Sequence, residues 1–98
     1  MRMLLKVQVP ADGGQQISDE EWPKKLKQML EMLKPEAAYF SPQDGMRTMM
    51  IFFDMKEVSM MPVVTTPLFD ELNAKVTLSP AMNFDDLVAG LKQSKSNR

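Results

Sequence analysis

The sequence predicts a small α+β domain, in which one antiparallel sheet has helices packed on one of its faces. Segments with the two-residue period of a strand alternate with segments that carry the apolar stripe of a helix. Proline, glycine, asparagine and aspartate separate these segments. The 98 residues suffice for one hydrophobic core and leave no room for a separate catalytic domain.

The first strand is expected over residues 3–9, where apolar side chains alternate with Lys6 and Gln8 until Pro10 ends the ladder. A polar loop follows. Ser18 and Glu21 have the spacing of a helix capping box.

The first helix is expected from about Trp22 to the residue before Pro35, with Pro23 suiting a start slightly later than the capping box. Its apolar residues recur at i, i+4, i+7, i+8 and i+11. They are Trp22, Leu26, Met29, Leu30 and Leu33.

A hairpin is expected next, because residues 36–41 read as a strand and 41–45 contain a proline and the pair Asp44-Gly45. The returning strand, Arg47–Met55, is apolar on both faces, with Met49, Ile51 and Phe53 on one side and Met50 and Phe52 on the other. A strand of this kind needs cover on both sides.

The second half of the chain predicts a helix, a strand and a last helix. Ser59 is a candidate N-cap, Pro67 is expected to kink or break the helix, and Asn73 suits a left-handed C-cap. Residues 75–79 alternate as a strand. Asn83 and Asp86 then open a short helix with the apolar stripe Phe84, Leu87, Val88 and Leu91.

The resulting order, β-α-β-β-α-β followed by a helix, is that of a ferredoxin-like domain, expected over residues 1–92 with a flexible polar tail at 93–98. The second sheet face, which carries Met50 and Phe52, would then lack cover. We expect the same face of a second copy to cover it through a two-fold axis. The alternative is that the last helix folds across this face within one chain.

Composition excludes several classes of function. Twelve basic and thirteen acidic residues give a net charge of −1, which argues against nucleic acid as a partner. Cysteine and histidine are both absent, so thiol and histidine nucleophiles, the usual zinc sites and histidine-ligated haem are excluded, and we expect no metal and no cofactor. No membrane span or signal peptide is apparent, so we expect a soluble cytoplasmic protein without a membrane partner.

Two further functions, copper(I) binding and RNA recognition, are disfavoured by the residues at the positions that they would require. The eleven methionines raise a copper(I) site, but most lie on predicted apolar faces, where thioethers serve as adaptable packing. The same element order also builds the RNA-recognition module, whose stacking aromatics are missing from the first strand here.

Several segments carry a resemblance to a family of small, uncharacterised bacterial proteins. They are residues 1–7 (MRMLLKV), 34–40 (KPEAAYF), 44–45 (DG), 67–69 (PLF) and 72–74 (LNA), and the similarity runs from about Met1 to Leu91. That family resembles the dimeric α/β barrel class, in which two ferredoxin-like sheets pack face to face. The resemblance therefore implies the fold and a homodimer, but it brings no agreed activity. Haem-degrading members of the class depend on a histidine, which this chain lacks.

Members of the barrel class work in an apolar pocket between sheet and helices with a few polar side chains. The candidates here for ligand binding are Trp22, Tyr39, Arg47 and Asn73, and those for acid–base chemistry are Tyr39 and Asp54. Each also has a structural explanation: a core residue for Trp22, a strand aromatic for Tyr39, a strand end for Asp54, a solvated side chain for Arg47 and a helix cap for Asn73.

Three functional hypotheses follow. The first is a homodimer that binds a small hydrophobic molecule between sheet and helices without catalysis. The second is a cofactor-independent isomerase or oxygenase acting on a small aromatic or polyketide-like substrate, with Tyr39 and Asp54 as acid and base. The third is a structural module that binds another protein through an unpaired sheet edge or an apolar patch.

Overall fold

The structure, a computed structural model, describes residues 1–11 and 20–96. Its elements follow the predicted order. They are β1 (Arg2–Pro10), α1 (Trp22–Leu33), β2 (Ala37–Gln43), β3 (Met46–Asp54), α2 (Met60–Leu72), β4 (Lys75–Pro80) and α3 (Phe84–Ser96).

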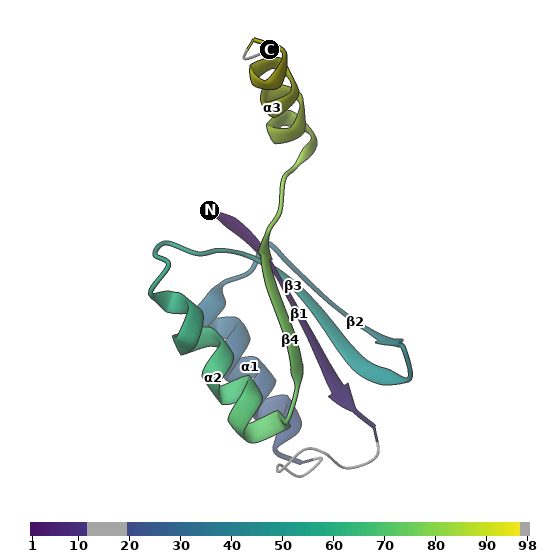
Figure 1. The fold of residues 1–98 in the computed structure, drawn as a ribbon. Coiled ribbons are helices and arrows are strands. Elements are labelled where there is room, and N and C mark those ends of the chain that lie inside the picture. The colour runs from purple at the N-terminus through teal and green to yellow at the C-terminus, as the bar shows by residue number, and fades with distance from the viewer. Residues whose placement is uncertain (12–19, 97–98) are drawn as a thin grey trace.

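The four strands form one antiparallel sheet in the order β2-β3-β1-β4, and α1 and α2 lie side by side on one of its faces (Figure 1). The sheet is open. This α+β architecture is compatible with a ferredoxin-like arrangement, as the sequence predicted.

The hydrophobic core lies between the sheet and these two helices. Register sets its layers, because Met3 pairs with Phe53, Leu5 with Ile51 and Val7 with Met49. All of these side chains are buried beneath the apolar stripes of α1 and α2. The predicted odd-numbered core face of β3 is therefore confirmed.

None of the described helices covers the opposite sheet face (Figure 1), and we call it the open face. Three of its cross-strand rows are Ala37–Phe52–Leu4–Ser79, Tyr39–Met50–Lys6–Thr77 and Ser41–Thr48–Gln8–Lys75. The first row is largely apolar and the third is polar. Apolar side chains thus gather at the end of the sheet where β1 begins.

Local sequence signals explain several boundaries. Asp44 and Gly45 both have positive φ, 55° and 71°, and form the predicted two-residue hairpin turn. Pro42 lies in β2, which is tolerated because β2 is an edge strand. Asn73 adopts the left-handed C-cap conformation expected of it.

Helix starts differ from the sequence expectations in part. Ser59 stands at the N-cap of α2, but its hydroxyl bonds to Glu57 and makes no cap hydrogen bond. Helix α2 runs through Pro67 without a break, with the proline ring exposed. Pro23 lies in the first turn of α1, as expected, whereas the Ser18 capping box lies outside the described residues.

Helix α3 projects beyond the end of the sheet, away from α1 and α2 (Figure 1). It extends to Ser96, into the segment expected to be a tail, and none of its residues is buried. The described molecule is consequently elongated, with extents of 53 × 27 × 19 Å. The alternative in which this helix covers the sheet of its own chain is not what the structure has.

Candidate functional site

An apolar hollow of about 360 Å³ opens at the hairpin end of the sheet, beneath the start of α1. We call it the hairpin-end pocket. Its volume lies in the range typical of small-molecule sites, roughly 300–1,000 Å³. Its lining residues are Val9, Trp22, Leu26, Phe40, Ser41, Pro42, Arg47, Thr48 and Met49.

The register of three strands builds the floor of this pocket. Phe40 pairs with Met49, and Pro42 and Val9 both pair with Arg47, so all five lie on the helix side of the sheet. The first two turns of α1 supply the roof through Trp22 and Leu26. Phe40 keeps about half of its surface exposed.

Trp22, which lines the pocket, carries a hydrogen-bond donor without a partner in the described structure. Its indole Nε1 is buried, yet it has no hydrogen-bond partner among the described residues. A buried donor without an acceptor costs about 1–3 kcal/mol. An acceptor atom on a bound molecule would remove that cost.

Arg47 supplies the positive charge. It is exposed at the pocket wall and forms no ion pair with any residue in the described ranges 1–11 and 20–96. A guanidinium presents several donors that match a carboxylate or a similar anion. The pocket therefore combines apolar walls with one cation, and one of its lining residues, Trp22, holds a buried donor without a partner in the described structure.

The other sequence candidates lie elsewhere. Tyr39 pairs with Met50 on the open face and is 64% exposed, and Asn73 caps α2. Asp54 stands at the end of β3, four residues beyond Met50, or roughly 13 Å along the strand. The structure thus brings Trp22 and Arg47 to one pocket and leaves Tyr39 and Asp54 apart from it and from each other.

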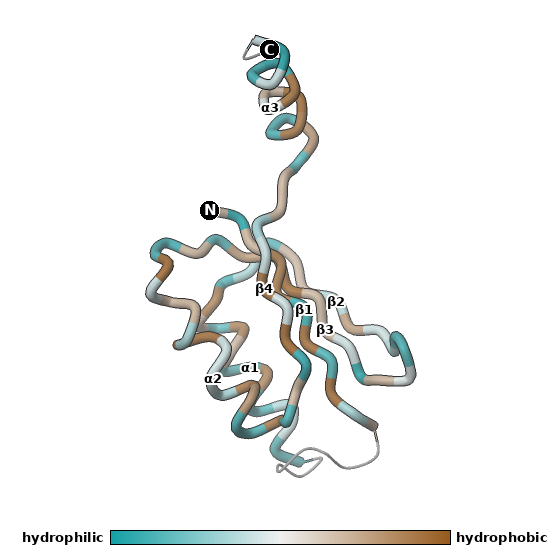
Figure 2. Tube along the Cα trace, in the orientation of Figure 1, coloured by the Kyte–Doolittle hydropathy of each residue, from teal (hydrophilic) through white to brown (hydrophobic). Residues whose placement is uncertain are grey.

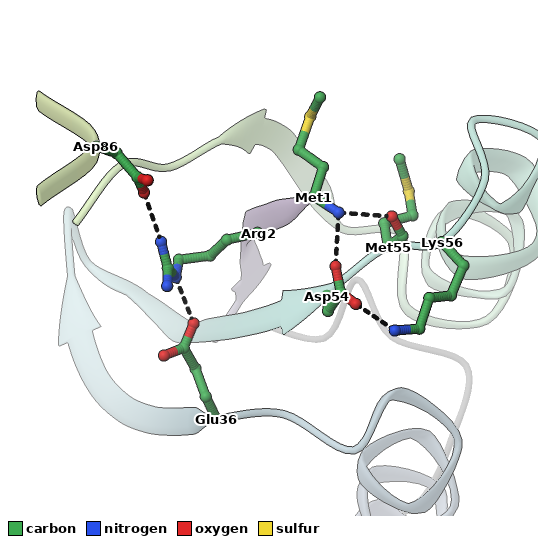
Figure 3. Close-up of polar contacts among 7 residues, drawn as sticks. All are labelled: Met1, Arg2, Glu36, Asp54, Met55, Lys56 and Asp86. Carbon is green, nitrogen blue, oxygen red and sulfur yellow. Dashed lines mark hydrogen bonds and ion pairs between the residues drawn. The ribbon is translucent and has the colours of Figure 1, made fainter. Parts of the chain in front are cut away.

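Asp54 takes part in a charge cluster at the opposite end of the sheet (Figure 3). Its carboxylate accepts hydrogen bonds from the Lys56 Nζ and from the Met1 amine. The Lys56 bond, followed by the Met1 bond, lowers the pKa of Asp54 from 3.8 to about 2. An acid–base role in an apolar pocket would need a shift in the other direction.

Phe40, Val9 and Met49 were not among the sequence candidates, although a signal for them existed. A two-residue turn at Asp44-Gly45 places Gln43 opposite Met46. Counting back along the hairpin then puts Phe40 on the core face and Tyr39 on the open face. The turn type therefore decides which aromatic of the pair lines the pocket.

A second apolar hollow, of about 290 Å³, lies between the outer surfaces of α1 and α2. The Lys25 Nζ and Glu71 Oε1 atoms approach to 3.4 Å across it, so its two charges are already paired. Trp22 also lines this groove. A ligand in this groove would therefore find no unpaired charge to bind among its described lining residues, whereas the hairpin-end pocket offers Arg47.

Comparison of the chain with protein-family models, with curated proteins and with solved structures finds no match. The family resemblance therefore stays a prediction. In the described part of the chain, no group of three or more acidic side chains is placed to hold a metal ion. No helix within it is long and apolar enough to cross a membrane.

Proposed function

We propose that this protein binds a small, largely apolar molecule with one anionic group in the hairpin-end pocket. The observation that carries the proposal is Trp22, which lines an apolar hollow of suitable volume and whose buried Nε1 lacks an acceptor among the described residues. Arg47, which lines the same pocket from β3, favours a carboxylate or sulfonate as the anionic group. The apolar part of the ligand would pack against Phe40 and Leu26.

We further propose that the binding unit is a homodimer of the dimeric α/β barrel type. The open face carries Phe52, Leu4 and Met50, which are only half-buried. Contact with the same face of a second copy would remove these side chains from water. The apolar lining of the hairpin-end pocket, with Val9, Phe40 and Met49, lies on the other side of the sheet from Phe52 and Leu4, so the ligand and the second copy would contact different apolar side chains.

An isomerase or oxygenase activity based on Tyr39 and Asp54 has no supporting geometry. Tyr39 faces away from the pocket, and Asp54 is held as an ion-paired carboxylate at the far end of β3. A protein-binding module remains the third hypothesis, and its candidate surface is the apolar part of the open face. Of the three hypotheses, ligand binding is the one for which a cation, Arg47, and a residue with an unpartnered donor, Trp22, line one pocket of the described structure.

Titration with two fluorescent probes of similar shape tests the ligand proposal. The first is 1-anilinonaphthalene-8-sulfonate, an apolar anion, and the second is N-phenyl-1-naphthylamine, its neutral analogue. Trp22 is the one tryptophan in the chain, so its fluorescence reports on the pocket directly. We expect saturable quenching of Trp22 by both probes, with tighter binding of the anion.

Two variants distinguish binding in the hairpin-end pocket from nonspecific binding of the probes to the protein surface. Arg47→Gln should weaken the anionic probe about tenfold and leave the neutral probe unchanged, since only the charge-assisted hydrogen bonds are lost. Lys27→Gln removes an exposed lysine of α1 that does not line the pocket, and should change neither affinity. Non-saturable quenching, or equal losses in both variants, would contradict the proposal.

A further inference from the structure

The α3 stripe, defined as Phe84, Leu87, Val88 and Leu91, is left uncovered by residues 1–11 and 20–96. Phe84 is 76% exposed and Leu91 is 56% exposed, and no residue of α3 is buried. Figure 2 shows apolar residues recurring along the projecting helix. An amphipathic helix gains most of its stability from packing its apolar face, so a stripe of this kind points to a missing surface.

The root of α3 is fixed in a position that keeps the stripe away from its own sheet. Ala81 N donates to Arg2 O, which carries β4 alongside β1 to the very end of the sheet. Arg2 Nη1 then donates to Asp86 Oδ2 in the first turn of α3, and its Nε donates to Glu36 (Figure 3). Asn83 and Asp86 close the capping box. The helix is therefore held outward at its base.

The apolar part of the open face lies next to this root. The row Ala37–Phe52–Leu4 is adjacent to the pair Arg2 and Asp54, where the sheet ends. The next row places Met50 and Tyr39 beside Lys6, which forms no ion pair in the described ranges, so the Lys6 ammonium is expected to stay in water at the edge of the contact. A dimer contact is therefore favoured at the α3 end of the sheet.

The apolar side chains of the open face provide only part of the area of a stable dimer interface. Complete burial of Leu4, Met50, Phe52 and the exposed part of Tyr39 would remove at most about 400 Å² per chain, given about 150–250 Å² for a whole aromatic side chain. A standard interface buries about 800 Å² per partner. The α3 stripe and the neighbouring Met82, which is 67% exposed, can supply the remainder.

We infer that α3 is an exchanged arm, whose apolar stripe packs against a second copy of this chain and continues the interface begun by the open face. One chain carries both unpartnered apolar surfaces at the same end. In a two-fold dimer, the α3 stripe of each copy would pack against the other copy, and the open faces would pack against each other. The inference rests on the homodimer proposed above and adds the element that completes its interface.

Sedimentation velocity on matched variants of the full chain tests the arm. Leu87→Asp with Leu91→Asp places two charges in the stripe and should raise the dimer dissociation constant at least about a hundredfold. Ala89→Asp with Gln93→Asp adds the same charges to the opposite side of α3 and should leave the constant within about threefold. Both double variants carry comparable costs to the helix itself.

The outcomes distinguish failure of the exchanged-arm inference from failure of the homodimer proposal. A dimer that survives Leu87→Asp with Leu91→Asp but dissociates with Phe52→Asp would overturn the arm and keep the sheet-face dimer. A monomeric wild-type chain would overturn both, and would leave the ligand pocket standing. Equal dissociation by both α3 double variants would also overturn the arm, because the effect would then not depend on the stripe.

Photo-crosslinking gives a second readout that does not depend on dissociation. A p-benzoylphenylalanine at position 91 is placed in chains with normal and heavy nitrogen, which are then mixed. The exchanged arm predicts crosslinks that join a light chain to a heavy one. Crosslinks confined to one chain, in a sample that sediments as a dimer, would overturn the inference.

Discussion

Arg2 Nη1 donates a hydrogen bond to Asp86 Oδ2 at 3.0 Å, and this contact joins the start of β1 to the first turn of α3. The two residues are 84 positions apart in the chain. The same guanidinium binds Glu36 Oε1 through Nε at 2.6 Å, so it bridges the chain before β2 and the base of α3. The Glu36 contacts, and then those to Asp86, raise the pKa of Arg2 above its usual value.

Replacing Arg2 with Gln is expected to loosen the base of α3 without unfolding the domain. Ion pairs at such exposed positions contribute little to the free energy of unfolding. Amide hydrogen exchange in the first turn of α3 should accelerate severalfold, whereas exchange in β1 should not change. Lys92→Gln, on α3 but without a described ion pair, serves as the control. Unchanged exchange at residues 84–88 would show that Arg2 does not restrain the helix.

Asp54 is expected to titrate far below an ordinary aspartate. Its folded pKa is lowered to about 2, chiefly by the hydrogen bond from Lys56. A lowered folded pKa adds stability that is fully present above the unfolded pKa, about 3.9, and is lost as pH falls through 2. Carbon-detected NMR of the Asp54 carboxyl should therefore give a midpoint near 2. Lys56→Met should raise that midpoint toward 3.8, and a wild-type midpoint near 4 would contradict the contacts described.

The buried Gln8 depends on Asp44 for its best hydrogen bond. Gln8 Nε2 donates to Asp44 Oδ2 at 3.1 Å and to Thr48 Oγ1 at 3.4 Å, and Gln8 is only 4% exposed. Asp44→Ala should lower the free energy of unfolding by about 1–2 kcal/mol, since it removes that acceptor and places alanine at positive φ. Asp44→Asn keeps an acceptor and tolerates this φ, so its cost should stay below about 1 kcal/mol. Equal losses in urea unfolding would argue against the Gln8 contact.

Phe52→Asp is expected to dissociate the proposed homodimer, because it places a charge in the apolar row of the open face. Phe69→Asp makes the same chemical change at an exposed position of α2, away from the open face, and should not alter the mass in solution. Light scattering coupled to size-exclusion chromatography distinguishes the two variants. A dimeric Phe52→Asp protein with a native circular dichroism spectrum would remove Phe52 from the interface.

Local signals in the sequence predicted most elements of the fold. The alternation in β1 and β3, the Asp44-Gly45 turn, the Asn73 cap and the Asn83–Asp86 capping box all act within a few residues, so the sequence alone reveals them. Ser59 is an exception among the local signals, because its hydroxyl bonds to Glu57, two residues away, instead of capping α2. The local pattern also did not predict that α2 would run through Pro67 without a break.

The candidate site was predictable only in part. Trp22 and Arg47 were candidates by residue type, but their meeting at one pocket depends on strand register and on the placement of α1 over the hairpin end. The outward position of α3 depends on Arg2 and Asp86, which are remote in sequence. No helical periodicity reports such a contact.

Native mass spectrometry of the wild-type chain tests most directly the central claim, that a second copy completes this molecule. The account predicts a species with the mass of two chains, which collapses to one chain when both Leu87 and Leu91 are replaced by Asp. A wild-type species with the mass of a single chain, over the whole concentration range at which the protein stays folded, would contradict it.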